Sequence, residues 1–237
     1  LETDPAYGVF HLDGQTIVLE DYLEIMPENR PRLEQLIQNG KLVAGPWYCM
    51  PDEFLLSGES LIKNLQKGFR IARQFGAEPM KYGYICDIFG HIAQMPQIFS
   101  QLGIHHALLG RGTNEHTTPA HFWWQGADGS RVTAFKLADK FGYGTYSNAV
   151  RSGGSLADNL RALVDYEAKR SDVPIVLLMD ATDHIPCNKD SAQQLELIRG
   201  MYPGAKVHHC SVMEMCRQLD RMDADRKSTR LNSSHQR

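Results

Sequence analysis

Short apolar segments alternate with amphipathic segments along most of this chain, and this alternation restricts the fold more than any other feature. The apolar segment 41–48 is followed at 57–75 by a segment whose apolar residues recur at helical spacing, and a second apolar segment follows at 82–86. This order is typical of βα units, which assemble into a parallel sheet or a barrel. The sequence therefore predicts an α/β fold.

Glycines and capping residues mark the ends of the predicted helices. A helix predicted at 30–38 stops before Gly40, and a longer helix begins after Ser57 and stops before Gly76. Glycine commonly follows the last helical residue, and serine commonly precedes the first. Further helices are predicted around Pro96, at about 155–170, after Asp190 and after Ser211.

Several other segments have distinct patterns. The segment 122–135 has two apolar runs around Asp128-Gly129 and predicts a β-hairpin. The glycine-rich segment 141–155 predicts a loop, and the wholly apolar segment 174–179 predicts a buried strand. Additional strands are expected at 8–12 and 105–109.

The composition is that of a globular protein without a nucleic-acid surface. The 237 residues carry a net charge of −3, and 42% of them are hydrophobic. No stripe of Lys and Arg supplies the concentrated positive charge that displaces counterions from nucleic acid. No apolar stretch approaches the length of about 18 residues that a membrane span requires, and the first residues lack the pattern of a signal peptide. We therefore expect a cytoplasmic location, with neither membrane nor nucleic acid as a partner.

The five cysteines lack CxxC spacing, so they predict reduced, buried thiols rather than a disulfide framework or a structural zinc site. The last residues differ from the rest of the chain. The segment 225–237 is polar, has no hydrophobic periodicity and resembles the translation of a sequencing adapter. We exclude it from the fold as a non-native tail. The expected organisation is one incomplete catalytic domain at 1–224, followed by this tail.

Carboxylates lie at or just beyond the ends of three predicted strands. They belong to Asp13, Asp87 and Asp183. In a β/α barrel, side chains at the carboxyl ends of the strands converge on one open mouth, where catalysis takes place. A single aspartate at a strand end can also cap a loop or a helix. Both interpretations apply to each of the three positions.

The surroundings of two of these carboxylates favour chemistry over capping. Phe89 and His91 follow Asp87 within about one turn, and the mixture of carboxylate, aromatic ring and imidazole is suited to binding a sugar. His91 by itself is more often a structural residue that hydrogen-bonds its loop. Asp183 follows an apolar segment, where partial desolvation would suit it to act as a general acid. Two carboxylates across a pocket are the minimal machinery of glycoside hydrolysis.

The aromatic pairs Trp47-Tyr48 and Trp123-Trp124 allow two interpretations. They could provide surfaces on which sugar rings stack, or they could fill the core. Core packing is favoured, because tryptophan side chains are mostly buried in folded proteins.

Three stretches of the sequence resemble one known family. They are the stretch 10–65, which begins "FHLDGQ", the stretch "CDIFGHIAQMPQIF" at 86–99 and the stretch "FWWQGADGSRV" at 122–132. Over residues 7–215 the chain resembles the catalytic domain of bacterial class II α-mannosidases, glycoside hydrolase family 38. The resemblance implies a seven-stranded β/α barrel, of which this chain forms part. It also implies retaining hydrolysis of terminal α-mannosides, one zinc ion and a mannose-containing carbohydrate as substrate.

The same resemblance assigns roles to four residues. Asp87 matches the nucleophile, which is also a zinc ligand, and Asp183 matches the general acid/base. Phe89 matches an aromatic contact beside the metal, and Arg111 matches an arginine that orients the nucleophile and the substrate. The other zinc ligands of the family are expected before Leu1 and beyond the tail. We therefore expect the chain alone to bind zinc poorly and to be inactive.

Two other functions stay open. A metal-dependent polysaccharide deacetylase also uses a β/α barrel with Asp and His ligands, but it would release acetate instead of mannose. A non-catalytic sugar-binding module would keep the aromatic contacts and would tolerate loss of Asp183. The sequence identifies neither the aglycone nor whether the chain forms a homo-oligomer.

Overall fold

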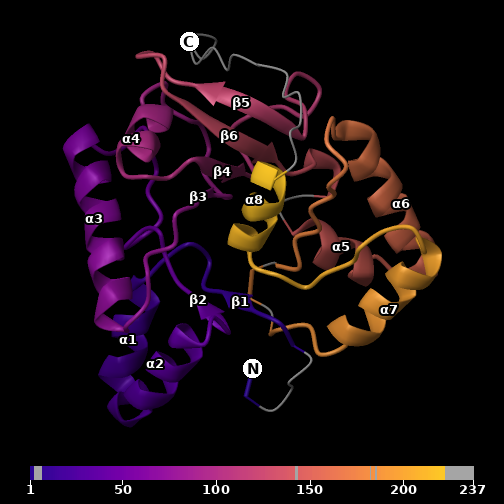
Figure 1. The fold of residues 1–237 in the computed structure, drawn as a ribbon, viewed down its shortest axis with the longest axis horizontal. Coiled ribbons are helices and arrows are strands. Elements are labelled where there is room, and N and C mark those ends of the chain that lie inside the picture. The colour runs from indigo at the N-terminus through magenta and orange to yellow at the C-terminus, as the bar shows by residue number, and fades with distance from the viewer. Residues whose placement is uncertain (3–6, 142–143, 182, 185, 222–237) are drawn as a thin grey trace.

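The computed structural model describes residues 1–2, 7–141, 144–181, 183–184 and 186–221. Helices lie on both sides of two small sheets, which confirms the predicted α/β class (Figure 1). The elements are β1 (Phe10–His11), α1 (Ile17–Ile25), η1 (Pro27–Asn29), α2 (Arg30–Gln38), β2 (Leu42–Val43), α3 (Gly58–Gln74), β3 (Gly83–Ile85), α4 (Met95–Gln101), β4 (His106–Leu109), β5 (His121–Gln125), β6 (Arg131–Lys136), η2 (Asp139–Phe141), α5 (Thr145–Arg151), α6 (Leu156–Arg170), α7 (Ser191–Met201) and α8 (Val212–Arg221).

The larger sheet has four strands in the order β3-β4-β6-β5. The first three are parallel, and β5 pairs antiparallel with β6 as the predicted hairpin. In the register of this sheet, Ile85 on β3 lies opposite Leu109 on β4. The residues two positions further along each strand therefore leave the sheet side by side. These residues are Asp87 and Arg111.

The smaller sheet consists of β1 and β2, which pair in parallel with Phe10 opposite Leu42. The pairing continues as a single bridge between Gln15 and Trp47. Among the described residues, the two sheets are not joined by a strand ladder, and they do not close into a barrel. The α/β class is confirmed, whereas a seven-stranded barrel is not.

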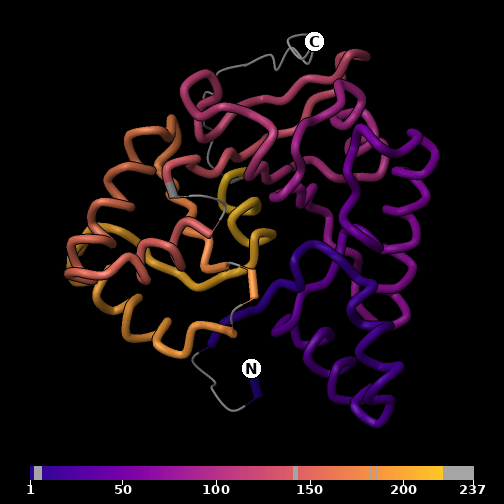
Figure 2. Tube along the Cα trace, turned by 180° about the vertical axis from the view of Figure 1, so that it is seen from behind, coloured from indigo at the N-terminus to yellow at the C-terminus, as the bar shows by residue number. Residues whose placement is uncertain are grey.

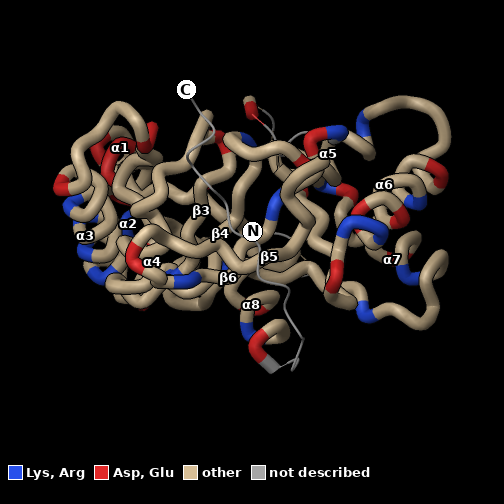
Figure 3. The backbone as a smooth tube through the Cα atoms, turned by 90° about the horizontal axis from the view of Figure 1, so that it is seen from above, with Lys and Arg blue, Asp and Glu red and all other residues tan. Residues whose placement is uncertain are grey.

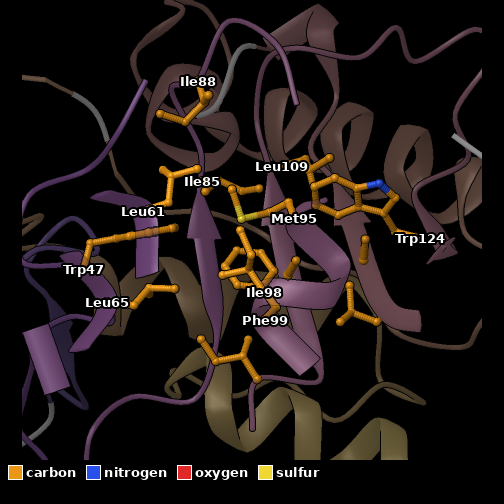
Figure 4. Close-up of a cluster of buried hydrophobic side chains, with 14 of the residues drawn as sticks. Trp47, Leu61, Leu65, Ile85, Ile88, Met95, Ile98, Phe99, Leu109 and Trp124 are labelled. Carbon is orange, nitrogen blue, oxygen red and sulfur yellow. The ribbon is translucent and has the colours of Figure 1, made fainter. Parts of the chain in front are cut away.

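The two faces of the larger sheet are covered by different helices. Alternate side chains of a strand point to opposite faces, so Ile85 and Tyr84 enter different clusters. Ile85 packs with α3 and α4, whose Leu61 and Phe99 are fully buried (Figure 4). Tyr84 packs on the other face with α8, where Leu219 is fully buried. Each such large apolar side chain stabilises the fold by about 1.5–3 kcal/mol.

A further helical group comprises α5, α6 and α7, and both ribbon views place it on the side of the sheets away from α3 (Figures 1 and 2). The predicted loop at 141–155 was wrong over 145–151, which form α5. The glycines flank this helix, and its Tyr146 and Ala149 are buried against Leu160 of α6. Tertiary burial therefore outweighs the weak local preference of this segment.

The predicted strand at 174–179 was also wrong, because this segment has no strand ladder. It is only partly buried, although Ile175 and Leu177 contact one core cluster and Leu178 contacts another. Its last residue bonds to α5 instead of to a neighbouring strand. The Met179 carbonyl accepts from the Tyr146 N–H at 2.9 Å.

The predicted helix ends are mostly confirmed. The Ser57 hydroxyl accepts from the Ser60 N–H at 3.2 Å at the start of α3, and the Ser211 hydroxyl accepts from the Glu214 N–H at 3.2 Å at the start of α8. Asp190 precedes α7 but makes no capping bond with its side chain. The five cysteines are free, but only Cys86 and Cys216 are buried, so the prediction of buried thiols was wrong for the other three.

On the outer helices of the described residues, Lys and Arg lie together with Asp and Glu (Figure 3). Over the described part of the chain, none of the helices has both the length and the apolar character that crossing a membrane demands. The predicted tail at 225–237 lies outside the described residues.

Candidate active site

Asp87 and Arg111 form an ion pair at the carboxyl ends of β3 and β4. The parallel register brings the two residues together, as described above. The backbone of Arg111 is fixed at the same place, because its N–H donates to the carbonyl of Cys86 at 3.0 Å. The guanidinium Nε lies against the Asp87 carboxylate. The arginine thus orients a carboxylate that is only partly buried and remains open to a ligand.

Phe89 places an exposed aromatic ring beside this ion pair. Its side chain is 68% exposed, and the guanidinium carbon of Arg111 lies 5.6 Å from the ring centroid. The ring is accessible to a ligand that binds at the ion pair. The structure therefore brings together three of the four predicted site residues, Asp87, Phe89 and Arg111.

Asp13 contributes a second carboxylate to the same region. It follows β1 with a φ of 37°, and its side chain hydrogen-bonds to Tyr84 of β3. Burial of the carboxyl group raises the pKa of Asp13, and the charges of Asp183 and Asp87 raise it further. The carboxylates of Asp183 and Asp87 thus each lie close enough to Asp13 to affect its pKa. The sequence had marked Asp13 as a strand-end residue without giving it a role.

Asp183 lies in an exposed turn. It is exposed, so the expected partial desolvation is not observed. The next residue, His184, has a φ of 58°, a left-handed conformation in which the chain turns sharply. Asp183 also follows the segment 174–179, which has no strand ladder. Its position is set by a turn, whereas the position of Asp87 is set by a sheet.

Trp47 and Trp124 belong to the core, as the sequence favoured, whereas Trp123 is only partly buried. Trp47 is fully buried and Trp124 is 2% exposed, so neither provides a surface for a sugar. The indole N–H of Trp47 donates to the carbonyl of Tyr84 at 2.7 Å. This bond ties the chain after β2 to β3, beside the residues that carry the site.

Comparisons with known proteins identify the family of this chain. Residues 1–184 match the family described as "Glycosyl hydrolases family 38 N-terminal domain". The chain belongs to glycosyl hydrolase family 38.

Relatives within and around this family extend the match over almost the whole chain. A protein of Halalkalibacterium halodurans described as a candidate mannosylglycerate hydrolase is 33% identical over 92% of this chain and 25% of its own length. Alpha-mannosidase G of Dictyostelium discoideum is 33% identical over 50% of this chain and 11% of its own length. The crystal structure of an alpha-mannosidase from Enterococcus faecalis V583 has a TM-score of 0.86 at 28% identity, covering 97% of this chain and 26% of that one. The chain thus spans about a quarter or less of the relatives it matches.

The family 38 chain does not supply a complete zinc site in its described residues. No group of three or more His, Cys, Asp and Glu side chains among them is arranged to hold a metal ion. The Asp87 carboxylate has Arg111 as its charged neighbour. A catalytic zinc ion needs about three protein ligands and one open position. The residues described here therefore do not fit a zinc ion by themselves.

Two residues near the family 38 site were not identified as functional from the sequence. Glu53 was not singled out, and His91 was interpreted as a structural residue of its loop. In the structure their side chains form a pair in the interior, and His91 also bonds to the backbone carbonyl of Arg111. No local signal marks Glu53, because its partners lie 38 and 39 residues further along the chain.

Proposed function

We propose that the full-length protein carrying this chain hydrolyses terminal α-mannosides with retention of anomeric configuration. The observation that carries the proposal is the ion pair of Asp87 with Arg111 at the ends of two parallel strands, beside the exposed ring of Phe89. In this proposal residues 1–224 are an incomplete catalytic domain. The remaining strands of a seven-stranded barrel come from other parts of the full-length protein.

In the first step, a carboxylate oxygen of Asp87 attacks the anomeric carbon of the mannoside. The bond from that carbon to the leaving oxygen breaks, and the electron pair goes to the leaving oxygen, which takes a proton from Asp183. The product is a mannosyl ester on Asp87. Arg111 holds the attacking carboxylate in place, and Phe89 lies against the apolar face of the sugar.

In the second step, water cleaves the ester. Asp183, now a carboxylate, removes a proton from water as the water oxygen attacks the anomeric carbon. The ester bond breaks, and its electron pair returns to Asp87. Two inversions at the same carbon give net retention, which is the stereochemical signature of this mechanism.

Zinc stays a prediction of the family resemblance. Within this chain Asp87 is the residue that would ligate it, and the described residues provide no further ligand set. When bound, a zinc ion would act as a Lewis acid toward the sugar hydroxyls. Because most ligands are expected elsewhere in the full-length protein, the 237-residue chain alone is expected to be inactive.

The proposed substrate is a mannoside whose aglycone this chain does not define. The relative described as a candidate mannosylglycerate hydrolase makes a mannosylated small acid the first compound to assay, beside oligomannose. Family membership does not favour the deacetylase alternative.

The proposal is tested by following the full-length protein with an aryl α-mannoside by proton NMR. We expect α-mannose to appear first and the β-anomer only later, by mutarotation. β-Mannose as the first product, or acetate release from an acetylated sugar with no mannose release, would contradict the proposal.

A further inference from the structure

Glu53 and His91 form a buried pair that the proposed mechanism does not use. Glu53 is 1% exposed and His91 is 8% exposed. The Glu53 Oε1 atom lies 2.9 Å from the His91 Nδ1 atom, and Glu53 Oε2 accepts from the N–H of Ile92 at 2.8 Å. Both oxygens of the carboxyl group are therefore engaged with the loop that follows Asp87.

The other ring nitrogen of His91 fixes the direction of the hydrogen bonds. The Nε2 atom lies 3.0 Å from the carbonyl oxygen of Arg111, which can only accept, so Nε2 carries a proton. A second proton must lie between Nδ1 and Glu53, because two bare acceptors would repel at 2.9 Å. The pair is therefore neutral overall, and each of its polar atoms is occupied, as burial requires.

The surroundings prevent this pair from shifting. The His91 ring meets Trp124 edge-on, with ring centroids 5.5 Å apart. On the other side lies Gly112, where an added Cβ would come within 2.7 Å of His91 Nε2. The φ of Gly112 is +79°, a conformation that other residues rarely adopt. The glycine leaves the space in which the bond from His91 to Arg111 forms.

Arg111 is consequently held on both sides of its backbone. Its N–H donates to Cys86, the residue before Asp87, and its carbonyl accepts from His91, four residues after Asp87. Its side chain forms the ion pair with Asp87 itself. The same short loop thus carries the carboxylate and fixes the arginine that orients it.

We propose that Glu53 and His91 are positioning residues, which hold the Arg111 backbone so that its side chain orients Asp87 for attack. This inference rests on the proposed function of Asp87 as nucleophile. Neither residue contacts Asp87 in the bonds described, so both act through Arg111.

The test compares His91→Gln with His91→Asn in the full-length protein. A glutamine amide reaches the position of Nε2 and can still donate to the Arg111 carbonyl, whereas the shorter asparagine cannot. With a chromogenic aryl α-mannoside we expect His91→Asn to lower kcat by about 100-fold at nearly unchanged KM, since small misplacements of reacting groups have effects of this size. His91→Gln should recover at least about tenfold of that loss. His208→Asn, on an exposed histidine, is the matched control and should keep wild-type kcat.

The proposal is overturned if folded His91→Asn keeps wild-type kcat, if it changes KM alone, or if His91→Gln recovers nothing. If His91→Asn does not fold, the comparison moves to Glu53→Gln and Glu53→Met. The glutamine keeps an acceptor for the Ile92 N–H and a hydrogen-bonding group toward His91, whereas the isosteric methionine keeps neither. The proposal then requires Glu53→Met to lower kcat as expected for His91→Asn, and Glu53→Gln to recover part of that loss as expected for His91→Gln.

Hydrogen exchange separates this inference from the proposed function. In the wild-type protein the Arg111 N–H is bonded to Cys86, and we expect its exchange to accelerate in His91→Asn but not in His91→Gln. If the wild-type protein hydrolyses no α-mannoside, the proposed function fails, while this exchange still shows whether the pair holds Arg111. Equal exchange in the wild type and both variants would show that it does not.

Discussion

The two carboxylates proposed for catalysis are held in different ways. Asp87 follows a buried strand, pairs with Arg111 and is supported from behind by Glu53 and His91. Asp183 is exposed and follows the segment 174–179, which has no strand ladder. The nucleophile side of the site is therefore a product of this chain's own core. Asp183 instead lies in an exposed turn.

The largest effect is expected from Asp87→Asn. An amide cannot attack the anomeric carbon, so kcat with an aryl α-mannoside should fall by about 10⁴-fold or more, as when other enzymes lose a nucleophile. Circular dichroism of the full-length variant checks that the fold is unchanged. A folded variant with a tenth or more of wild-type kcat would remove Asp87 from its proposed role.

A smaller and substrate-dependent effect is expected from Asp183→Asn. Loss of a general acid should lower kcat by about 10²–10⁴-fold on a mannoside with an alkyl aglycone. A dinitrophenyl mannoside should suffer much less in the first step, because its leaving group needs no proton. Equal losses on the two substrates would contradict the assignment and would leave Asp87 as the better supported member of the pair.

Substitution of an apolar residue that packs near Asp87 should lower the free energy of unfolding by more than substitution of one that precedes Asp183. Ile85 is the last residue of β3 and is fully buried. Ile85→Ala should therefore lower the free energy of unfolding by about 2–5 kcal/mol. Leu178 lies in the partly buried segment before Asp183, and Leu178→Ala should cost roughly half as much. Urea denaturation followed by tryptophan fluorescence measures both, since Trp47 and Trp124 lie in the same cluster as Ile85. Equal losses would show that the two regions are supported alike.

A further effect is expected from pH at the junction between the N-terminal strand and α8. Burial and, to a smaller extent, the neighbouring His209 together lower the pKa of His11 from 6.5 to about 4. Between these pH values the unfolded chain binds the proton that the folded chain excludes. The contribution of His11 to the free energy of unfolding is complete above pH 6.5. It is lost as the pH falls toward 4, and the loss is at most about 3 kcal/mol.

This pH effect is measured as the urea midpoint at pH 7 and pH 5 for the wild type and for His11→Gln. The Nε2 atom of His11 accepts from the Val212 N–H at 3.4 Å, which requires the neutral ring. The variant should therefore lose part of the pH dependence. His208→Gln is the control, because His208 is exposed. An unchanged pH dependence in His11→Gln would contradict this account of the junction.

Much of the Asp87 side was predictable from local sequence. Ser57 and Gly76 mark the limits of α3, and Asp128-Gly129 marks the hairpin, because caps and turns depend on neighbouring residues. The position of Asp87 at a strand end followed from the apolar segment before it. Its partnership with Arg111 followed only from the family resemblance, since the register of two strands is a long-range property.

The features that escaped prediction depend on contacts between distant residues. The segment 174–179 has the composition of a buried strand, but it forms no ladder with any strand of the described residues, and its last residue bonds to α5. The helix α5 forms between glycines because Tyr146 and Ala149 are buried by α6. Glu53 lies beside exposed Phe54 and Leu55 in sequence, and its burial results from His91 and Ile92.

The most direct test of the central claim is to identify the residue that carries the sugar in the glycosyl-enzyme intermediate. The full-length protein is inactivated with a fluorinated mannosyl inactivator, digested and analysed by tandem mass spectrometry. The account predicts a single mannosyl ester on Asp87, in the peptide that contains "CDIFGH". A label on Asp13, on Asp183 or on any other residue would contradict it.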